Sequence, residues 1–375
     1  MAPCCGDGRH ERCASRHNVG QLLFGACVDI LFWLACATVV IVLLFDYTNG
    51  FHDAANIVAT VIASRAMTPA QAVLIVGVFE FLGPVLGGTA VANTIGSVVD
   101  LSEIPARQAL LVMFCGLLGA IGWNLFTWWR GIPSSSSHAL VGGLAGAVTV
   151  AVGADHVVWG FAVLFSRGQV TGVTKVLLAL LISPLAGFWF GYLIHRLMHA
   201  LLLSARPAAN HGLKMAQFAT AAGLAFAHGA NDAQKSMGVL TLVLLLGGFI
   251  PVFEVPFWVI LACASAITLG ILSGGWRIVR TLGFAIYRLR PLHALDSQLT
   301  SAAVIFTASL IGAPVSTTHV VASSIMGIGA SERPRAVRWI KAKEIVSTWV
   351  ITIPGAALAA IIIYAIARAA FGPAF

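Results

Sequence analysis

Two pairs of polar motifs interrupt the long apolar runs of this 375-residue chain. One pair carries carboxylates and amides: residues 46–56 read DYTNGFHDAAN, and residues 225–235 read AFAHGANDAQK. The other pair places hydroxyl residues between a proline and a histidine: residues 133–138 read PSSSSH, and residues 314–319 read PVSTTH. Carboxylate and amide oxygens suit hard cations, whereas hydroxyls at a helix start suit an oxyanion.

The motifs occur in the same order in each half of the chain. Aligned without gaps, Gly50 matches Gly229 and Asp53 matches Asp232. A weaker echo pairs the glycine and threonine residues of 87–96 with those of 274–283. Three motif pairs in one order predict an internal duplication of about half the chain.

The composition predicts an integral membrane protein surrounded by a lipid bilayer. The chain is 59% hydrophobic and 10% charged, with a mean hydropathy of +0.92, whereas a soluble domain carries about 25% charged residues. The apolar runs are continuous and long enough for spanning helices. The net charge of +8 fits basic cytoplasmic loops, and no basic stretch interleaved with base-stacking aromatics supports a nucleic acid partner.

These patterns predict an all-α integral membrane protein with two inverted-topology repeats and about 10–12 membrane helices, including two re-entrant hairpins. The expected parts are a polar N-terminal tail (1–20), a first membrane repeat (21–203), a linker (204–213) and a second membrane repeat (214–375).

Local breaks are expected at the acidic motifs. The first span is predicted to end at Asp46, with a separate short helix over 49–65. The second motif is assigned to 214–234, followed by a span over 236–252. A single kinked span is expected over 70–98, because Pro84 and several glycines interrupt it.

The proline and hydroxyl motifs are predicted to be the tips of the two hairpins. Arms over 297–312 and 315–330 lie between two basic loops, so this hairpin should enter and leave on the cytoplasmic side. The first pair of arms, 106–129 and 135–152, lacks this basic bias and is expected to face outside. A serine or threonine at each tip should cap the following helix, whose free N–H groups attract an anion.

The tip hydroxyls are the candidate ligands of a small tetrahedral anion such as phosphate or sulfate: Ser135, Ser136, Ser137, Ser316, Thr317 and Thr318. Asp53 and Asp232 are the candidate carriers of a coupling ion, which is either a proton or a hard cation such as Na⁺. Four amides are predicted to add oxygen ligands: Asn49, Asn56, Asn231 and Gln234. Four further residues are possible accessories: His52, His228, Lys235, which can pair with Asp232 or meet the anion, and Glu80.

Other functional classes are less well supported by the sequence. A channel gains nothing from coupling carboxylates. An enzyme would need a nucleophile and a base, and the pair Ser137–His138 has no third orienting group. The N-terminal Cys4, Cys5 and Cys13 with His10 and His17 match no tight metal pattern, so no fixed metal site and no cofactor are expected.

The motifs resemble the paired G-A-N-D-x-A-N signature of the PiT family of inorganic phosphate transporters. GFHDAAN at 50–56 and GANDAQK at 229–235 carry the resemblance, and the tips at 133–138 and 314–319 also match. It covers nearly the whole chain, from about 21 to 367. The departures, such as His52 for asparagine, are similar to those of the low-affinity bacterial branch.

The resemblance implies a symporter of the cell membrane that takes up inorganic phosphate, not an enzyme. In that branch the coupling ion is a proton, and phosphate travels as a neutral complex with a divalent metal such as Mg²⁺. Other branches use Na⁺, and some bacterial members carry sulfate. The tips are then implied to bind phosphate and the acidic motifs to bind the coupling ion, and a homodimer is one possible assembly.

Overall fold

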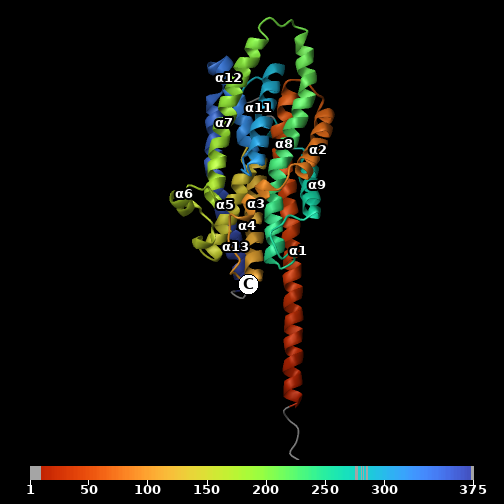
Figure 1. Cartoon of the computed structure of the whole chain (residues 1–375), viewed down its shortest axis with the longest axis vertical. Coiled ribbons are helices and arrows are strands. Elements are labelled where there is room, and N and C mark those ends of the chain that lie inside the picture. Colours follow the sequence, from red (N-terminus) through yellow and green to blue (C-terminus); the bar gives the residue numbers. More distant parts are fainter. Residues whose placement is uncertain (1–9, 275–277, 280, 282, 284–285, 373–375) are drawn as a thin grey trace, which may run out of the picture.

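The computed structural model describes residues 10–274, 278–279, 281, 283 and 286–372, and these residues form α-helices without strands. The basic loop residues Arg277 and Arg280, together with Cys4 and Cys5, lie outside the described residues. Figure 1 shows the bundle, whose helices are α1 (His10–Ala63), α2 (Pro69–Leu86), α3 (Ala90–Gly96), α4 (Ala106–Arg130), α5 (Ser136–Ala151), α6 (Phe161–Arg167), α7 (Gly172–Leu201), α8 (Ala209–Leu246), α9 (Phe257–Ser273), α11 (Pro291–Leu310), α12 (Thr317–Glu332) and α13 (Trp339–Phe371).

Both acidic motifs lie inside continuous helices, which corrects the predicted breaks. α1 runs for 54 residues through the first motif, and α8 runs for 38 residues through the second. α1 also begins at His10, so much of the predicted polar tail is helical. Asparagine, aspartate and glycine are poor helix formers, but tertiary contacts override this preference when neighbouring helices satisfy the polar side chains.

The glycine of each acidic motif allows two helices to touch backbone to backbone. A Cβ on Gly50 of α1 would lie 2.1 Å from the carbonyl oxygen of Ile267 in α9. A Cβ on Gly229 of α8 would lie 2.3 Å from the carbonyl oxygen of Glu80 in α2. The aligned glycines therefore have the same structural role: Gly50 allows α1 to pack closely on α9, and Gly229 allows α8 to pack closely on α2.

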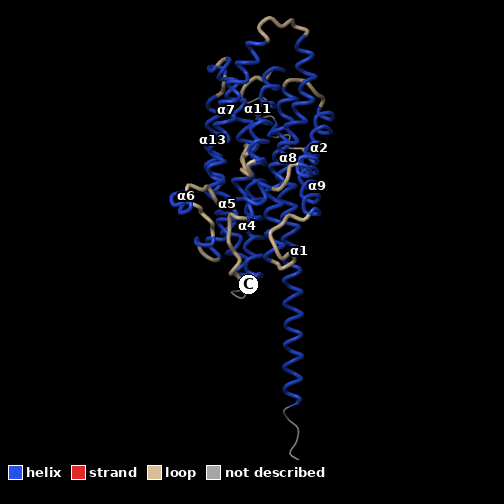
Figure 2. Tube along the Cα trace, viewed as in Figure 1, coloured by secondary structure: helices blue, strands red, loops and turns tan. Residues whose placement is uncertain are grey.

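The hydroxyl motifs lie where α4 gives way to α5 and where α11 gives way to α12. Ser135 caps α5 by accepting from the N–H of His138 at 3.2 Å, and Ser316 caps α12 by accepting from the N–H of His319 at 3.3 Å. The predicted caps are confirmed. Figure 2 shows loop backbone halfway along the helical bundle as well as at its ends.

The span predicted over 70–98 is divided. α2 ends at Leu86, and the backbone is non-helical before α3 begins at Ala90. Gly88 has a φ of 78°, a left-handed conformation that glycine adopts without strain. Such a break needs polar partners for its free backbone groups. Gln234 of α8 supplies them, as described below.

The described residues include five helices that are long and apolar enough to cross a membrane: Ile30–Ala63, Pro69–Leu86, Ala106–Arg130, Gly172–Leu201 and Trp339–Ala370. Large apolar side chains cover the outside of the bundle; Phe165 is 86% exposed and Ile340 is 77% exposed. A protein whose exterior is apolar and whose interior holds many polar groups is suited to lipid. The inverted topology and the re-entrant hairpins stay predictions.

Candidate functional site

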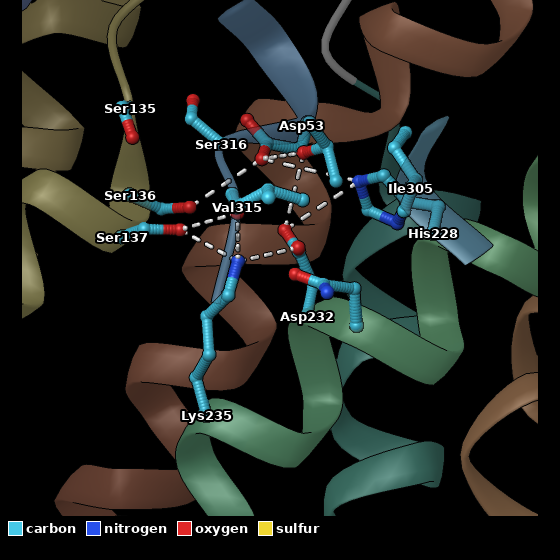
Figure 3. Close-up of polar contacts among 12 residues, drawn as sticks. Asp53, Ser135, Ser136, Ser137, His228, Asp232, Lys235, Ile305, Val315 and Ser316 are labelled. Carbon is cyan, nitrogen blue, oxygen red and sulfur yellow. Dashed lines mark hydrogen bonds and ion pairs between the residues drawn. The ribbon is translucent and has the colours of Figure 1, made fainter. Parts of the chain in front are cut away.

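The two acidic motifs and the two tips meet at one buried centre. Figure 3 shows Asp53 of α1 and Asp232 of α8 facing the start of α5 and the loop that leads into α12. The Thr317 hydroxyl lies 3.3 Å from Asp53 Oδ2 and 3.3 Å from Asp232 Oδ2. Its single proton can serve only one carboxylate at a time, so Thr317 links the two acids.

The Asp53 carboxylate receives hydroxyl donors from both tips. Ser136 donates to Oδ2 at 3.4 Å, and Thr318 donates to Oδ1 at 3.3 Å. His52 Nδ1 donates to Oδ1 at 2.7 Å. Three of the predicted anion ligands, counting Thr317, therefore contact a predicted coupling acid directly.

The Asp232 carboxylate is paired with a lysine from its own helix. Lys235 Nζ donates to Asp232 Oδ1 at 2.7 Å, one turn along α8. The same ammonium donates to Ser137 Oγ at 2.6 Å and to the Val315 carbonyl oxygen at 2.8 Å. Asp232 is one of the two partners predicted for Lys235, and the two residues form an ion pair here.

A third buried acid reaches the centre through a histidine. His228 Nδ1 donates to Glu80 Oε1 at 2.7 Å, which joins α8 to α2. The other ring nitrogen, Nε2, lies 3.6 Å from Asp232 Oδ2 and 3.9 Å from Asp53 Oδ2. His228 Nε2 has no hydrogen-bond partner, so it faces two carboxylates across a short gap (Figure 3).

The aligned residues of the two motifs contact opposite tips. Asn56 Nδ2 donates to Thr318 Oγ1 at 2.9 Å, and Lys235 donates to Ser137. Asn56 aligns with Lys235, and Thr318 aligns with Ser137. Each half of the chain thus has a contact between its acidic motif and the tip of the other half, in addition to contacts with its own tip.

The remaining predicted amide ligands differ in what they contact. Asn49 is buried and neither of its amide atoms has a partner. Asn231 donates to Ser309 Oγ at 3.0 Å and leaves Oδ1 without a partner. Gln234 accepts from the N–H of Val91 at 2.8 Å and donates to the Gly87 carbonyl at 3.2 Å. Both polar atoms of Gln234 are therefore used by the break between α2 and α3.

Two residues near the centre were not among the predicted site residues. Ser134 Oγ lies 3.3 Å from His52 Nε2, so it supports the imidazole that donates to Asp53. Asp46 is fully buried in α1 and accepts from Ser236 Oγ at 2.6 Å. The run of four consecutive serines in the sequence could have indicated Ser134. Asp46 lies two helical turns before Asp53, and this relation is apparent only once α1 is known to be continuous.

The centre is sealed and rich in negative charge. Asp53, Asp232 and Thr317 are each at most 1% exposed. Ligand atoms of Asp53, His228 and Asp232 lie within 4.8 Å of one another, which is a spacing that a single cation can bridge. Asp53, Asp232 and Glu80 are three buried carboxylates, and Lys235 forms an ion pair with one of them, Asp232. The arrangement can therefore accept a proton or a cation.

The fold and this centre define a multi-pass membrane protein with a buried cluster of acidic, basic and hydroxyl side chains at its centre. A family model described as "Phosphate transporter family" matches residues 49–360, and the chain belongs to that family. The resemblance to the PiT family is thereby confirmed. The predicted membrane location agrees with this assignment.

Relatives support the assignment. A "Probable low-affinity inorganic phosphate transporter" of Bacillus subtilis is 40% identical over 347 residues, which cover 92% of this chain and 100% of the relative. A protein of the same description from Rhizobium meliloti is 40% identical over 337 residues, covering 89% and 97%. The solved structure of "The sodium-dependent phosphate transporter" has a TM-score of 0.79 and 23% identity, covering 90% and 99%, and shows the shared fold.

Proposed function

We propose that this chain is a symporter that takes up inorganic phosphate together with protons. One observation carries the proposal: at a sealed centre, hydroxyls from both tips donate to Asp53 and Asp232. The groups best suited to hold a phosphate are thus the same groups that stabilise two buried carboxylates.

This geometry gives a physical reason for coupling. A phosphate that takes over the donors of Ser136, Thr317 and Thr318 leaves the carboxylates without them. It also brings negative charge next to negative charge in a medium of low dielectric constant. Binding becomes favourable only when a positive charge arrives as well. A proton, a metal cation or a neutral metal–phosphate complex would each meet this need.

His228 is the proposed proton carrier. Its Nε2 faces both Asp53 and Asp232, and Glu80 holds the opposite side of the ring. Protonation of Nε2 would place a donor between the two carboxylates when their hydroxyl donors are engaged by phosphate. Glu80 then fixes the ring orientation and stabilises the charged imidazole.

Na⁺ coupling is the second candidate. The ligand atoms of Asp53, His228 and Asp232 lie within 4.8 Å of one another, and Asn49 carries an amide without partners nearby in the same helix as Asp53. The structural neighbour is described as sodium-dependent. Sulfate is an alternative substrate, because the same hydroxyls fit either tetrahedral oxyanion.

Alternating access fits the sealed site. The two tips and the two acidic motifs exchange contacts between the halves, so movement of one half against the other would open the centre on one side at a time. We propose that the halves are inverted repeats and that the tips are re-entrant. A channel would instead need a continuous path past the contacts of Thr317 and Lys235.

The test is uptake of radiolabelled phosphate into proteoliposomes with an imposed pH gradient. We expect uptake to follow the proton gradient without Na⁺, to rise with Mg²⁺ and to resist excess sulfate. Strict Na⁺ dependence would replace the proton by Na⁺. Strong competition by sulfate would change the substrate, and uptake indifferent to both gradients would contradict symport.

A further inference from the structure

The Lys235 ammonium lies in a cage of three oxygen atoms of different kinds. They are the Ser137 hydroxyl at 2.6 Å, the Asp232 carboxylate at 2.7 Å and the Val315 carbonyl at 2.8 Å. Hydroxyl, carboxylate and carbonyl oxygens are the ligands that hard cations select. Figure 3 shows the side chain reaching these atoms from α8, and the residue is only 2% exposed.

The cage uses every donor that the ammonium has. A lysine ammonium carries three N–H bonds, and three oxygens receive them. No donor is left for a phosphate oxygen while these contacts persist. Lys235 therefore acts toward its own protein as a bound cation does, compensating Asp232 and joining the two tips through Ser137 and Val315.

The first half has no charge at the equivalent place. Asn56 aligns with Lys235 and makes the equivalent contact with the opposite tip, but through a neutral amide. Asp53 is consequently served by hydroxyls and by His52 instead of an ammonium. One half carries its own cation, and the other half does not.

We propose that Lys235 is a tethered counter-cation that fills a monovalent-cation site in the second half and thereby excludes Na⁺ from it. The inference rests on the proposed proton symport, because it assigns external ion binding to the side of Asp53 and His228 alone. Lys235 is then a specificity-determining residue for the coupling ion. Replacing it by the asparagine of the first half should open a Na⁺ site beside Asp232.

The experiment compares Lys235→Asn with wild type and with Lys175→Asn. Lys175 is a second lysine with a side-chain contact, to Thr94 Oγ1 at 3.0 Å, and it serves as the control for loss of a lysine. The thermal unfolding midpoint of each purified protein is measured while choline chloride is replaced by NaCl at constant ionic strength. We expect a Na⁺-dependent rise of about 5 °C in Lys235→Asn only.

Transport gives the second readout. Phosphate uptake by Lys235→Asn should rise about tenfold when Na⁺ replaces choline, whereas uptake by wild type should not change. A folded Lys235→Asn protein with no Na⁺ response in either assay would overturn the proposal. The unfolding assay needs no phosphate and no gradient. It therefore tests whether Lys235 excludes Na⁺ even if wild-type uptake does not follow the proton gradient.

A double variant covers the case in which Lys235→Asn does not fold. Asp232→Asn with Lys235→Asn removes both charges and leaves neutral amides. If the double variant folds and the single variant does not, Lys235 is a counter-charge, as proposed. If neither folds, the lysine is needed for packing and the proposal fails. A Na⁺ response in the double variant would also overturn it, because the carboxylate ligand is gone.

Discussion

The two acidic motifs occupy equivalent places in α1 and α8, but their carboxylates are compensated differently. Asp53 relies on His52 and on hydroxyls of both tips. Asp232 relies on the ammonium of Lys235, with His228 alongside. The backbone requirement is the same in both halves, since Gly50 and Gly229 each sit against a neighbouring helix.

This difference separates what the backbone at the two motifs requires from what the charges of their side chains require. The close backbone contacts leave no room for a Cβ at Gly50 or at Gly229, so both positions need glycine. Charge need only balance over the whole site, so the compensating groups can be redistributed between the halves. The asymmetry also leaves Asp232 paired with an ammonium from its own helix and Asp53 with an imidazole and hydroxyls.

The largest effect is expected from removing either acid. Asp53→Asn and Asp232→Asn should each reduce phosphate accumulation by roughly a hundredfold or more, because loss of one partner of a buried charge network costs about 3–5 kcal/mol. Of the two variants, Asp232→Asn should have the lower unfolding temperature, because it leaves the Lys235 ammonium without its carboxylate partner. Proteoliposome uptake and thermal unfolding test this pair. Full uptake in both variants would refute the coupling role, and equal unfolding temperatures would refute the asymmetry.

The tip hydroxyls offer a second, smaller contrast. Thr317 contacts both acids, whereas the aligned Ser136 contacts only Asp53. Thr317→Val should raise the KM for phosphate about tenfold, the loss expected for a hydrogen bond to a charged group. Ser136→Ala should raise the KM only about threefold, because Ser136 contacts one carboxylate instead of two. The reverse order would show that bridging of the two carboxylates is unimportant.

The third contrast concerns the proposed proton carrier. Glu80→Gln keeps an oxygen acceptor for His228 but removes the negative charge of residue 80. The variant should therefore shift the pH profile of phosphate uptake and lower the uptake rate about tenfold. Asn49 aligns with His228 in the first half, and Asn49→Ala should lower the rate without moving the profile. Uptake is measured over a range of pH values at a fixed gradient. An unmoved profile in Glu80→Gln would count against proton transfer at His228.

The smallest effect is expected at the ends of the two capped helices. α12 ends at Glu332, whereas α5 ends at Ala151 in the aligned position. Burial disfavours the charged Glu332 carboxylate, but a hydrogen bond from Tyr287 and the nearby His293 and Arg290 outweigh burial and lower its pKa to about 2.

A lowered pKa means that Glu332 stabilises the fold above its ordinary pKa of about 4.3, and that this contribution fades as the pH falls toward 2. Glu332→Gln should therefore lower the thermal midpoint at pH 7 but have less effect near pH 3. Lys341→Gln, which removes an exposed pair with Glu344, should change little at either pH. An effect of Glu332→Gln that is independent of pH would contradict the ionic role.

The sequence predicted the all-α membrane class, the capped tips and the family, since each depends on local pattern. Apolar runs, a proline before Ser135 or Ser316 and a duplicated acidic signature are readable without coordinates. The predicted helix breaks at the motifs were wrong. Local propensity favoured them, but α1 and α8 continue because contacts from neighbouring helices satisfy their polar side chains.

The tertiary structure alone decided what each polar side chain does. Both amide atoms of Gln234 form hydrogen bonds with the backbone at the gap between α2 and α3. Glu80 accepts a hydrogen bond from His228. The tertiary structure also placed the Lys235 ammonium against Asp232, Ser137 and the Val315 carbonyl. The sequence defines which groups must be buried together, but buried charges are stabilised by atoms a few ångströms away, and those atoms come from distant parts of the chain.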